Sequence, residues 1–382
     1  MRIVMLLHKS AEHDARVRRE AKALSGAGHE VVIVHLPRRG SSTVGVEAEP
    51  YELRSASPGP RLERLPGPAR WATGAAALAR LALRERPDAI HAHDAAMLVP
   101  GRFVARRTGA RLVYDSHELA SGVPYRSRGW AALVTSIERR IVPRCDAVIT
   151  VSDGIADRIQ AEYALADRPT IVRNLPDLPP PEGGAAEDVR ATLSIGEAPL
   201  IIHHGAVAAD RGCEGLLRAL ALVDGAHLLF LGAEGPYAIG LERLSASLGL
   251  SSRVHFHDPV PLSELLSYSS QADVGATLLE DTCENHRLAL PNKAFEYLAA
   301  GIPVVASDLP ELSRIVHEYG VGWTVDPADP ASIAEGLRAA IAARGDGGLG
   351  ERVRRAADEL SWDREKVRLL ELYARLGARH SA

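Results

Sequence analysis

Polar side chains in the stretch from 288 to 311 stand where they could bind an anion. Pro291 suits the first turn of a helix, because its missing N–H would be unpaired there anyway, and apolar residues then recur at helical spacing as far as Gly301. The start of a helix has unpaired N–H groups and a partial positive charge, so it attracts phosphate. The stretch therefore predicts a phosphate-binding helix start, with Lys293 and Glu296 on the helix that follows.

A second group of polar residues stands at the end of a strand predicted at 87–91. Alternate residues of a strand share a face, so His91 and His93, with Asp94 beside them, could ligate a metal ion. No further cluster of ligand types in the sequence completes such a site, and we predict no metal. We expect these residues instead to line a cleft or to fix the end of the strand.

Polar residues at the start of the first predicted helix could carry function or serve only the fold. Asp14, Arg16 and Arg19 stand where a loop enters a helix predicted at 15–27. An aspartate there commonly caps the helix, and the alternative is that one of the arginines contacts a ligand.

His117 follows a strand predicted at 111–115. It could contact a ligand, or it could only pair with a neighbouring carboxylate such as Asp115 or Glu118. The residue types alone leave both interpretations open.

Strands and helices alternate along the chain, which predicts two doubly wound parallel α/β sheets. We expect one domain at 1–175, joined by a last helix at 363–382, and a second domain at 183–362. The residues between them are rich in proline and glycine, as in an interdomain linker. Ligands of such sheets bind outside the carboxyl ends of the strands. Strands are predicted at 2–7, 31–34, 87–91, 111–115, 146–151, 199–204, 227–231, 254–257, 272–278, 304–306 and 322–325.

The composition is that of an ordinary globular protein, with 382 residues, 46% of them hydrophobic and 25% charged. No apolar run approaches the roughly 18 residues that a membrane helix needs. The first residues are expected to form a strand rather than a signal peptide. Three widely separated cysteines argue for a reducing compartment and against a disulfide scaffold.

The charges are unevenly distributed. Residues 1–182 hold 27 Lys and Arg against 21 Asp and Glu, whereas the remainder has a net charge of −10. These can be two ordinary solvated surfaces, or a basic N-terminal half that faces an anionic acceptor or lipid surface.

The run Leu-Pro-Asn-Lys-Ala-Phe-Glu-Tyr at 290–297 resembles the donor-binding helix of glycosyltransferase family four, most closely a subgroup that opens this helix with Leu-Pro-Asn-Lys-x-Phe-Glu-Tyr. The resemblance implies the GT-B fold, with two Rossmann-like domains facing a central cleft, and a retaining reaction. It also implies that Glu296 holds the ribose of a nucleotide sugar. Backbone groups near Leu290, Pro291 and Asn292 would hold the diphosphate.

Weaker matches to the family lie elsewhere in the chain. His117 matches a histidine that points at the donor sugar. Gly205 and Arg211 match a glycine turn that carries basic residues for the diphosphate, although an arginine beside a helix start can be only a surface charge. Gly232 and Glu234 lie in a turn like the family's Gly-x-Gly-Pro loop.

Two positions depart from the family pattern. Leu288 stands where many members have a glutamate that binds the donor sugar, and Glu284, Asn285 or Lys293 could replace it. Ala206 stands where a first basic residue is usual. The glycine pair that often follows the first strand is also missing.

The resemblance implies a hexosyltransferase-type enzyme that moves a sugar from a nucleotide-diphosphate donor to an acceptor hydroxyl. Arg211, Lys293 and the helix start would stabilise the diphosphate leaving group, and no cofactor or metal is needed. The alternatives are a sugar-nucleotide epimerase or hydrolase, and a non-catalytic nucleotide-sugar-binding subunit. A Rossmann dehydrogenase is disfavoured, because the first turn lacks Gly-x-Gly-x-x-Gly.

Acceptor contacts are expected from the N-terminal domain, with Asp14, Arg16, Arg19, His93 and Asp94 as candidates. The irregular stretch at 38–74 could also contribute. The acceptor can be a glycan, a lipid-linked sugar or a small molecule, and nothing resembles a nucleic-acid motif. We expect a cytoplasmic protein whose basic N-terminal domain can contact the inner face of the membrane.

Overall fold

The computed structural model describes all residues except 38–48, 58, 60–66, 124–127, 178–187 and 379–382. The chain divides into two units, which are described separately. Unit 1 comprises Met1–Asn174 and Glu365–Ala382, and unit 2 comprises Leu175–Arg364. Most of the predicted proline-rich linker lies outside the described residues.

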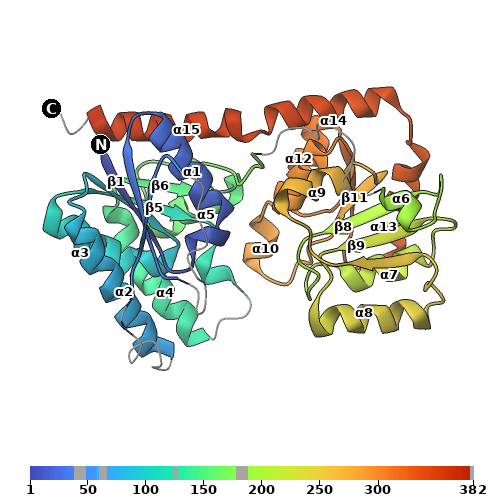
Figure 1. Cartoon of the computed structure of the whole chain (residues 1–382), viewed down its shortest axis with the longest axis horizontal. Coiled ribbons are helices and arrows are strands. Elements are labelled where there is room, and N and C mark those ends of the chain that lie inside the picture. Colours follow the sequence, from blue (N-terminus) through green and yellow to red (C-terminus); the bar gives the residue numbers. More distant parts are fainter. Residues whose placement is uncertain (38–48, 58, 60–66, 124–127, 178–187, 379–382) are drawn as a thin grey trace. The chain divides into compact units, whose positions relative to one another are not determined.

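Unit 1 contains a seven-stranded sheet in which every pairing is parallel, with the order β3-β2-β1-β4-β5-β6-β7. The order reverses between β1 and β4, so the sheet is doubly wound as predicted. The strands are β1 (Arg2–Leu7), β2 (Glu30–His35), β3 (Glu52–Ser55), β4 (Ala89–His93), β5 (Arg111–Ser116), β6 (Ala147–Thr150) and β7 (Thr170–Ile171). The helices are α1 (Ala15–Gly26), α2 (Gly67–Arg84), α3 (Leu98–Thr108), α4 (Arg128–Ile141) and α5 (Asp153–Tyr163) (Figure 1).

Unit 2 repeats this plan with a six-stranded parallel sheet in the order β10-β9-β8-β11-β12-β13. The strands are β8 (Leu200–His204), β9 (His227–Leu231), β10 (Val254–His257), β11 (Val274–Thr277), β12 (Val304–Ser307) and β13 (Gly322–Val325). The helices are α6 (Val189–Thr192), α7 (Cys213–Leu220), α8 (Gly235–Ser247), α9 (Leu262–Ser269), α10 (Glu284–Leu288), α11 (Asn292–Ala299), α12 (Pro310–Tyr319), α13 (Pro330–Ala342) and α14 (Gly347–Glu359). The last helix, α15 (Trp362–Ala378), belongs to unit 1 from Glu365 onward.

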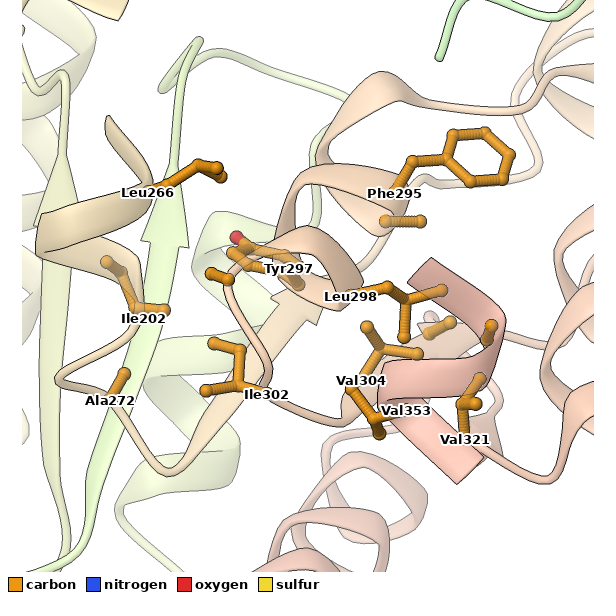
Figure 2. Packing of buried hydrophobic residues seen from close by; sticks show 14 of the residues in the cluster. Ile202, Leu266, Ala272, Phe295, Tyr297, Leu298, Ile302, Val304, Val321 and Val353 are labelled. Carbon is orange, nitrogen blue, oxygen red and sulfur yellow. The ribbon is translucent and has the colours of Figure 1, made fainter. Parts of the chain in front are cut away.

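Both faces of the unit 2 sheet are buried, because alternate residues of each strand join different hydrophobic clusters. Ile202 of β8 and Val304 of β12 pack with α9, α11 and α14, whereas Ile201 and Val305 pack with α7 and α13. Figure 2 shows the first cluster, in which Tyr297 of α11 lies among the strand residues. Helix α11 is therefore fixed to the sheet beside the ends of β8 and β11.

Three details of the sequence prediction are wrong. The stretch at 38–74 is not irregular throughout, since its described part contains β3 and the first residues of α2. The polar stretch at 280–287, which the sequence predicts to be a loop that leads into the donor helix, contains the start of the short helix α10, which Cys283 caps through its Sγ. Pro291 does not occupy the first helical turn but precedes it, and α11 begins at Asn292. A proline is tolerated at either position because the missing N–H costs no hydrogen bond there.

Candidate active site

Glycine turns shape the carboxyl edge of the unit 2 sheet. Gly205 follows β8 with a φ of 81°, and Gly232 follows β9 with a φ of 101°. The Gly205 N–H donates to the Leu231 carbonyl, and the Gly232 N–H donates to the His257 carbonyl, each over 2.9 Å. A Cβ on Gly232 would lie 2.9 Å from the Gly205 oxygen. Because position 232 has a positive φ and lies so close to Gly205, a residue with a Cβ would not fit there, and glycine is required.

Lys293 stands in the first turn of α11, next to the end of β8. Its Nζ lies 3.1 Å from Nε2 of His203, and burial lowers the pKa of the ammonium to about 8. Burial also lowers the pKa of His203 well below its usual value, so the neutral ring accepts from the lysine. Within the part of the chain that the structure describes, Lys293 has no salt-bridge partner.

Arg211 adds a second cation from the turn between β8 and α7. Gly212 holds this turn against β11, since a Cβ there would lie 2.3 Å from the Leu278 carbonyl oxygen. The positive charge of Arg211 helps to lower the pKa values of Lys293 and His203, so the guanidinium acts on both groups. Among the described residues it has no salt bridge either. Two cations without carboxylate partners, beside a helix start, form a site suited to an anion.

Glu296 lies one turn further along α11 and is fixed by a histidine. Its Oε2 accepts from Nε2 of His204 over 2.8 Å, and Nδ1 of His204 lies 3.0 Å from the Ser269 hydroxyl. Burial lowers the pKa of His204, so the ring is neutral and its single proton is on Nε2. The Tyr297 hydroxyl accepts from the backbone N–H of His204 over 3.0 Å. The carboxylate is thus oriented while 17% of its side chain stays exposed, which leaves it able to accept from hydroxyl groups.

The remaining unit 2 candidates have different surroundings. Leu290 is buried in the hydrophobic cluster of Figure 2, so only its backbone can face a ligand. Asn285 is buried on α10 and Glu284 is exposed there, four residues before Leu288. The exposed Glu234 precedes α8 without capping it through its side chain. The structure therefore groups Lys293, Arg211, Glu296, Gly205 and Gly232, and it identifies His203 and His204 as positioning residues that the sequence analysis did not single out.

In unit 1 the N-terminal arginines have structural partners. Arg16 is 4% exposed and binds Asp115 through two hydrogen bonds, of 3.1 Å from Nε and 2.9 Å from Nη2. Its Nε also lies 3.0 Å from Glu20, four residues later. The proposed ligand contact of Arg16 is therefore wrong, because the buried guanidinium is already paired. Arg19 donates to the Asn174 side chain.

Asp14 is the N-cap of α1, which confirms the structural alternative. Its Oδ1 accepts from the backbone N–H of Val17 over 3.1 Å. Its Oδ2 forms a salt bridge of 2.9 Å with Lys9.

His117 stands at the end of β5 among carboxylates. Its Nε2 lies 3.1 Å from Asp115 Oδ2 and 3.0 Å from His93 Nδ1, and its Nδ1 lies 3.6 Å from Asp94. Burial would lower the pKa of His117, but Asp94 and Asp115 outweigh it and raise the pKa to about 9. Burial lowers the pKa of His93 to about 3, so that ring is neutral and accepts. His117 is therefore held as a cation, which can donate but cannot act as a base at neutral pH.

The same end of the sheet gathers residue types that bind metal ions. Glu20, His91, His93 and Asp115 are buried, and their ligand atoms lie within 4.8 Å of one another. The sequence argument that no further cluster completes the histidine pair is therefore wrong, since α1 and β5 supply two carboxylates. However, Arg16 contacts both carboxylates, and together with the His117 cation beside Asp115 it offsets their two negative charges. A buried ion-pair network accounts for the group without a metal ion.

Two family models match the chain. Residues 15–178 match the model "Glycosyltransferase Family 4", and residues 198–343 match "Glycosyl transferases group 1". The chain is 28% identical to D-inositol 3-phosphate glycosyltransferase of Xylanimonas cellulosilytica, over 77% of its own length and 73% of that protein. It is also 28% identical to the GDP-mannose-dependent alpha-(1-6)-phosphatidylinositol monomannoside mannosyltransferase of Mycolicibacterium smegmatis, over 85% of this chain and 87% of that protein.

Solved structures share the fold. Sucrose-phosphate synthase from Thermosynechococcus elongatus superposes with a TM-score of 0.80 at 20% identity, covering 99% of this chain and 100% of that one. HepE from Anabaena, solved with UDP and glucose, superposes with a TM-score of 0.76 at 16% identity, over 98% and 100% of the two chains. The two parallel sheets are those of the GT-B fold, as predicted.

Proposed function

Because the chain belongs to glycosyltransferase family four, whose members are retaining enzymes that use nucleotide sugars, we propose that it moves a sugar from a nucleotide-diphosphate donor, bound by unit 2, to an acceptor hydroxyl. The observation that carries the donor site is the pair of cations, Lys293 and Arg211, that form no salt bridge among the described residues and lie beside the start of α11. The finer likeness to the Leu-Pro-Asn-Lys-x-Phe-Glu-Tyr subgroup is part of the proposal.

The cations act on the charge that develops as the sugar leaves. Transfer breaks the bond between the anomeric carbon and the diphosphate, so negative charge grows on the phosphate oxygen. Lys293, Arg211 and the N–H groups at Asn292 and its neighbours are fixed beforehand, and such groups stabilise a developing charge without reorganisation. Gly205 and Gly232 leave the backbone open to the diphosphate.

Glu296 holds the ribose hydroxyls and thereby fixes the position of the reactive carbon. His204 keeps the carboxylate in place. His117, held as a cation, donates to the sugar, and no proton transfer is assigned to it. Asp94 and His93 orient His117 rather than contact the acceptor. Glu284 and Asn285 are the candidates for the sugar contact that Leu288 does not supply.

The acceptor is proposed to be a hydroxyl on a glycan, a lipid-linked sugar or a small molecule. A lipid-bearing acceptor has the support that a relative named above acts on a phosphatidylinositol monomannoside. Unit 1 is the side from which we expect acceptor contacts. The reaction is proposed to need no metal and no cofactor besides the donor.

A thermal-shift panel with UDP, GDP, ADP, CDP and dTDP tests the donor site. A ligand at about 100 times its dissociation constant adds about 2.7 kcal/mol to the stability of the domain that binds it. We expect a shift with one or two of the diphosphates, with and without magnesium, and a loss of turnover in Arg211→Ala that exceeds its loss of affinity. No shift with any diphosphate, or Arg211→Ala turning over at the wild-type rate, would contradict the proposal. Binding without turnover on a broad acceptor panel would favour a non-catalytic subunit, and full release of nucleotide without an acceptor would favour a hydrolase.

A further inference from the structure

Exposed apolar side chains gather on two neighbouring helices of unit 1. Of the large hydrophobic side chains that the described residues leave exposed, half lie on α3 and α4, and the others stand singly on separate elements. Scattered exposed hydrophobics are ordinary, whereas a group of them marks a binding surface. We name the α3–α4 patch by six residues, which are Val99, Phe103, Arg106, Arg107, Trp130 and Leu133.

The two helices present these residues side by side. Val99, Phe103 and Ile141 at the end of α4 line one hollow of about 370 Å³. Trp130 is eleven residues, about three turns, before Ile141 and so lies along the same side of α4, and Leu133 is the neighbour of Trp130 three residues later. Arg107 stacks over the Phe103 ring, 5.0 Å from its centroid. The apolar groups and the guanidinium groups therefore share one surface.

The helices beside the patch carry almost no negative charge of their own. The sequences of α2, α3 and α4 contain nine arginines and a single acidic residue, Glu138. Glu138 is 2% exposed and accepts from the hydroxyls of Tyr114 and Tyr163, so it does not reach the surface. The exposed charge of α3 and α4 is thus entirely positive.

We propose that the α3–α4 patch docks this enzyme on an anionic lipid bilayer. Arginines attract anionic headgroups, while Phe103, Trp130 and Leu133 enter the boundary between headgroups and acyl chains. No described helix is long and apolar enough to span a membrane, so the contact is made from the surface. A second copy of the chain fits less well, because two such patches would bring arginines together without carboxylates.

The proposal goes beyond the transfer reaction and does not depend on the donor or acceptor. It is tested by flotation of the full chain with vesicles of phosphatidylcholine alone, and of phosphatidylcholine with a third of phosphatidylglycerol, at low and high salt. We expect binding to the anionic vesicles, at least tenfold weaker binding to the neutral ones, and release by salt.

Variants separate the two parts of the patch. Arg106→Glu with Arg107→Glu, and Phe103→Ser with Leu133→Ser, should each weaken anionic-vesicle binding at least tenfold. The matched controls are Arg354→Glu with Arg355→Glu on α14, and Ile239→Ser on α8, where the isoleucine is 48% exposed. All of these side chains are exposed, so circular dichroism and thermal melting should be unchanged.

Several results would overturn the proposal. One is a wild-type protein that stays with the soluble fraction at low salt, and another is vesicle binding that both patch variants retain. Loss of a solution dimer in Leu133→Ser, without vesicle binding, would assign the patch to self-association. Binding of a DNA oligonucleotide, but not of vesicles, that is lost with the arginines would assign it to nucleic acid. Nucleotide binding should be the same in every variant, so a result that overturns the membrane proposal can be told apart from one that overturns the proposed donor site.

Discussion

Raising the pH from 7 to 9 should weaken the binding of a nucleoside diphosphate about tenfold. The pKa of Lys293 is lowered to about 8, and burial is the largest cause. An anion binds the protonated form, so the apparent dissociation constant follows the fraction of protein in which Lys293 is charged. That fraction falls from about 90% at pH 7 to about 10% at pH 9. Affinity is thus complete below pH 7 and is lost as the pH rises through 8.

No other group facing Lys293 should titrate in this interval. His203 is neutral throughout, because burial lowers its pKa well below the usual value. Burial raises the pKa of the Cys213 thiol to about 11. Burial also lowers the pKa of His204. The secondary ionisation of a phosphate, with a pKa near 6, is already about 90% complete at pH 7, so it changes little above that pH.

Isothermal titration calorimetry at pH 7, 8 and 9, with the diphosphate that the thermal-shift panel selects and at constant ionic strength, would measure the effect. Lys293→Arg keeps the charge, so its affinity should not depend on pH. Lys293→Met should also give a flat profile, but weaker. The loss of one charged hydrogen bond, about 1.5–3 kcal/mol, corresponds to about 10- to 150-fold. A wild-type affinity that is equal at pH 7 and 9 would refute the assignment, and so would a Lys293→Arg variant with the wild-type slope.

Three further changes test the surroundings of the sites. Glu296→Ala should weaken nucleotide binding more than tenfold, and an unchanged dissociation constant with an intact circular dichroism spectrum would refute its ribose role. Asp94→Asn should lower the pKa of His117, followed by NMR of its ring, by about one to three pH units, and asparagine has the same size and shape as the aspartate that it replaces. Gly275→Ala would place a Cβ 2.2 Å from the tyrosine ring of α11, so urea unfolding should show a loss of about 1–3 kcal/mol. The control Gly240→Ala on α8, where no atom lies within 4 Å, should not be destabilised.

Sequence patterns predicted the strands well because each strand is a short run of β-forming residues between turn residues. The runs at His227–Leu231, Val254–His257 and Gly322–Val325 begin and end where predicted. His227–Leu231 is a buried apolar run, whereas Val254–His257 and Gly322–Val325 are partly buried edge strands. Their β-branched and aromatic residues, bounded by turn residues, are enough to mark them as strands. Some elements, α3 among them, were not predicted. In these elements proline or glycine interrupts the helical spacing of the apolar residues, or the element lies between less regular stretches. Their conformation depends on packing against the sheet.

The candidate site could be predicted only where adjacent residues act together. Lys293 and Glu296 share one helix, and their spacing was visible. His203 and His204, which position them, end a buried strand about 90 residues earlier, and such a pair looks like ordinary strand-end histidines. The hydrogen bonds to α11 arise only when β8 and α11 meet in the fold.

Arg16 and Arg211 show that the sequence alone does not distinguish an arginine of a structural ion pair from an arginine that is available to a ligand. Each is an arginine near a helix start after a buried strand, and both were candidates for ligand contact. The sequence held one signal, because Glu20 follows Arg16 at the i,i+4 spacing of a helical ion pair. In the fold Asp115 adds a second carboxylate, and Arg16 and the His117 cation together offset the two negative charges.

In unit 2 the cations beside the start of α11 are not offset in this way by the described carboxylates. Glu296 is engaged by His204, and neither Lys293 nor Arg211 forms a salt bridge with any described residue. The lowered pKa of Lys293 means that the free protein loses stability by keeping the ammonium charged below pH 8. A bound diphosphate would supply the missing negative charge and raise that pKa. Unpaired cations beside a helix start are therefore better evidence for an anionic ligand than the presence of arginine or lysine in a motif, since the same residue type in unit 1 serves only to neutralise its neighbours.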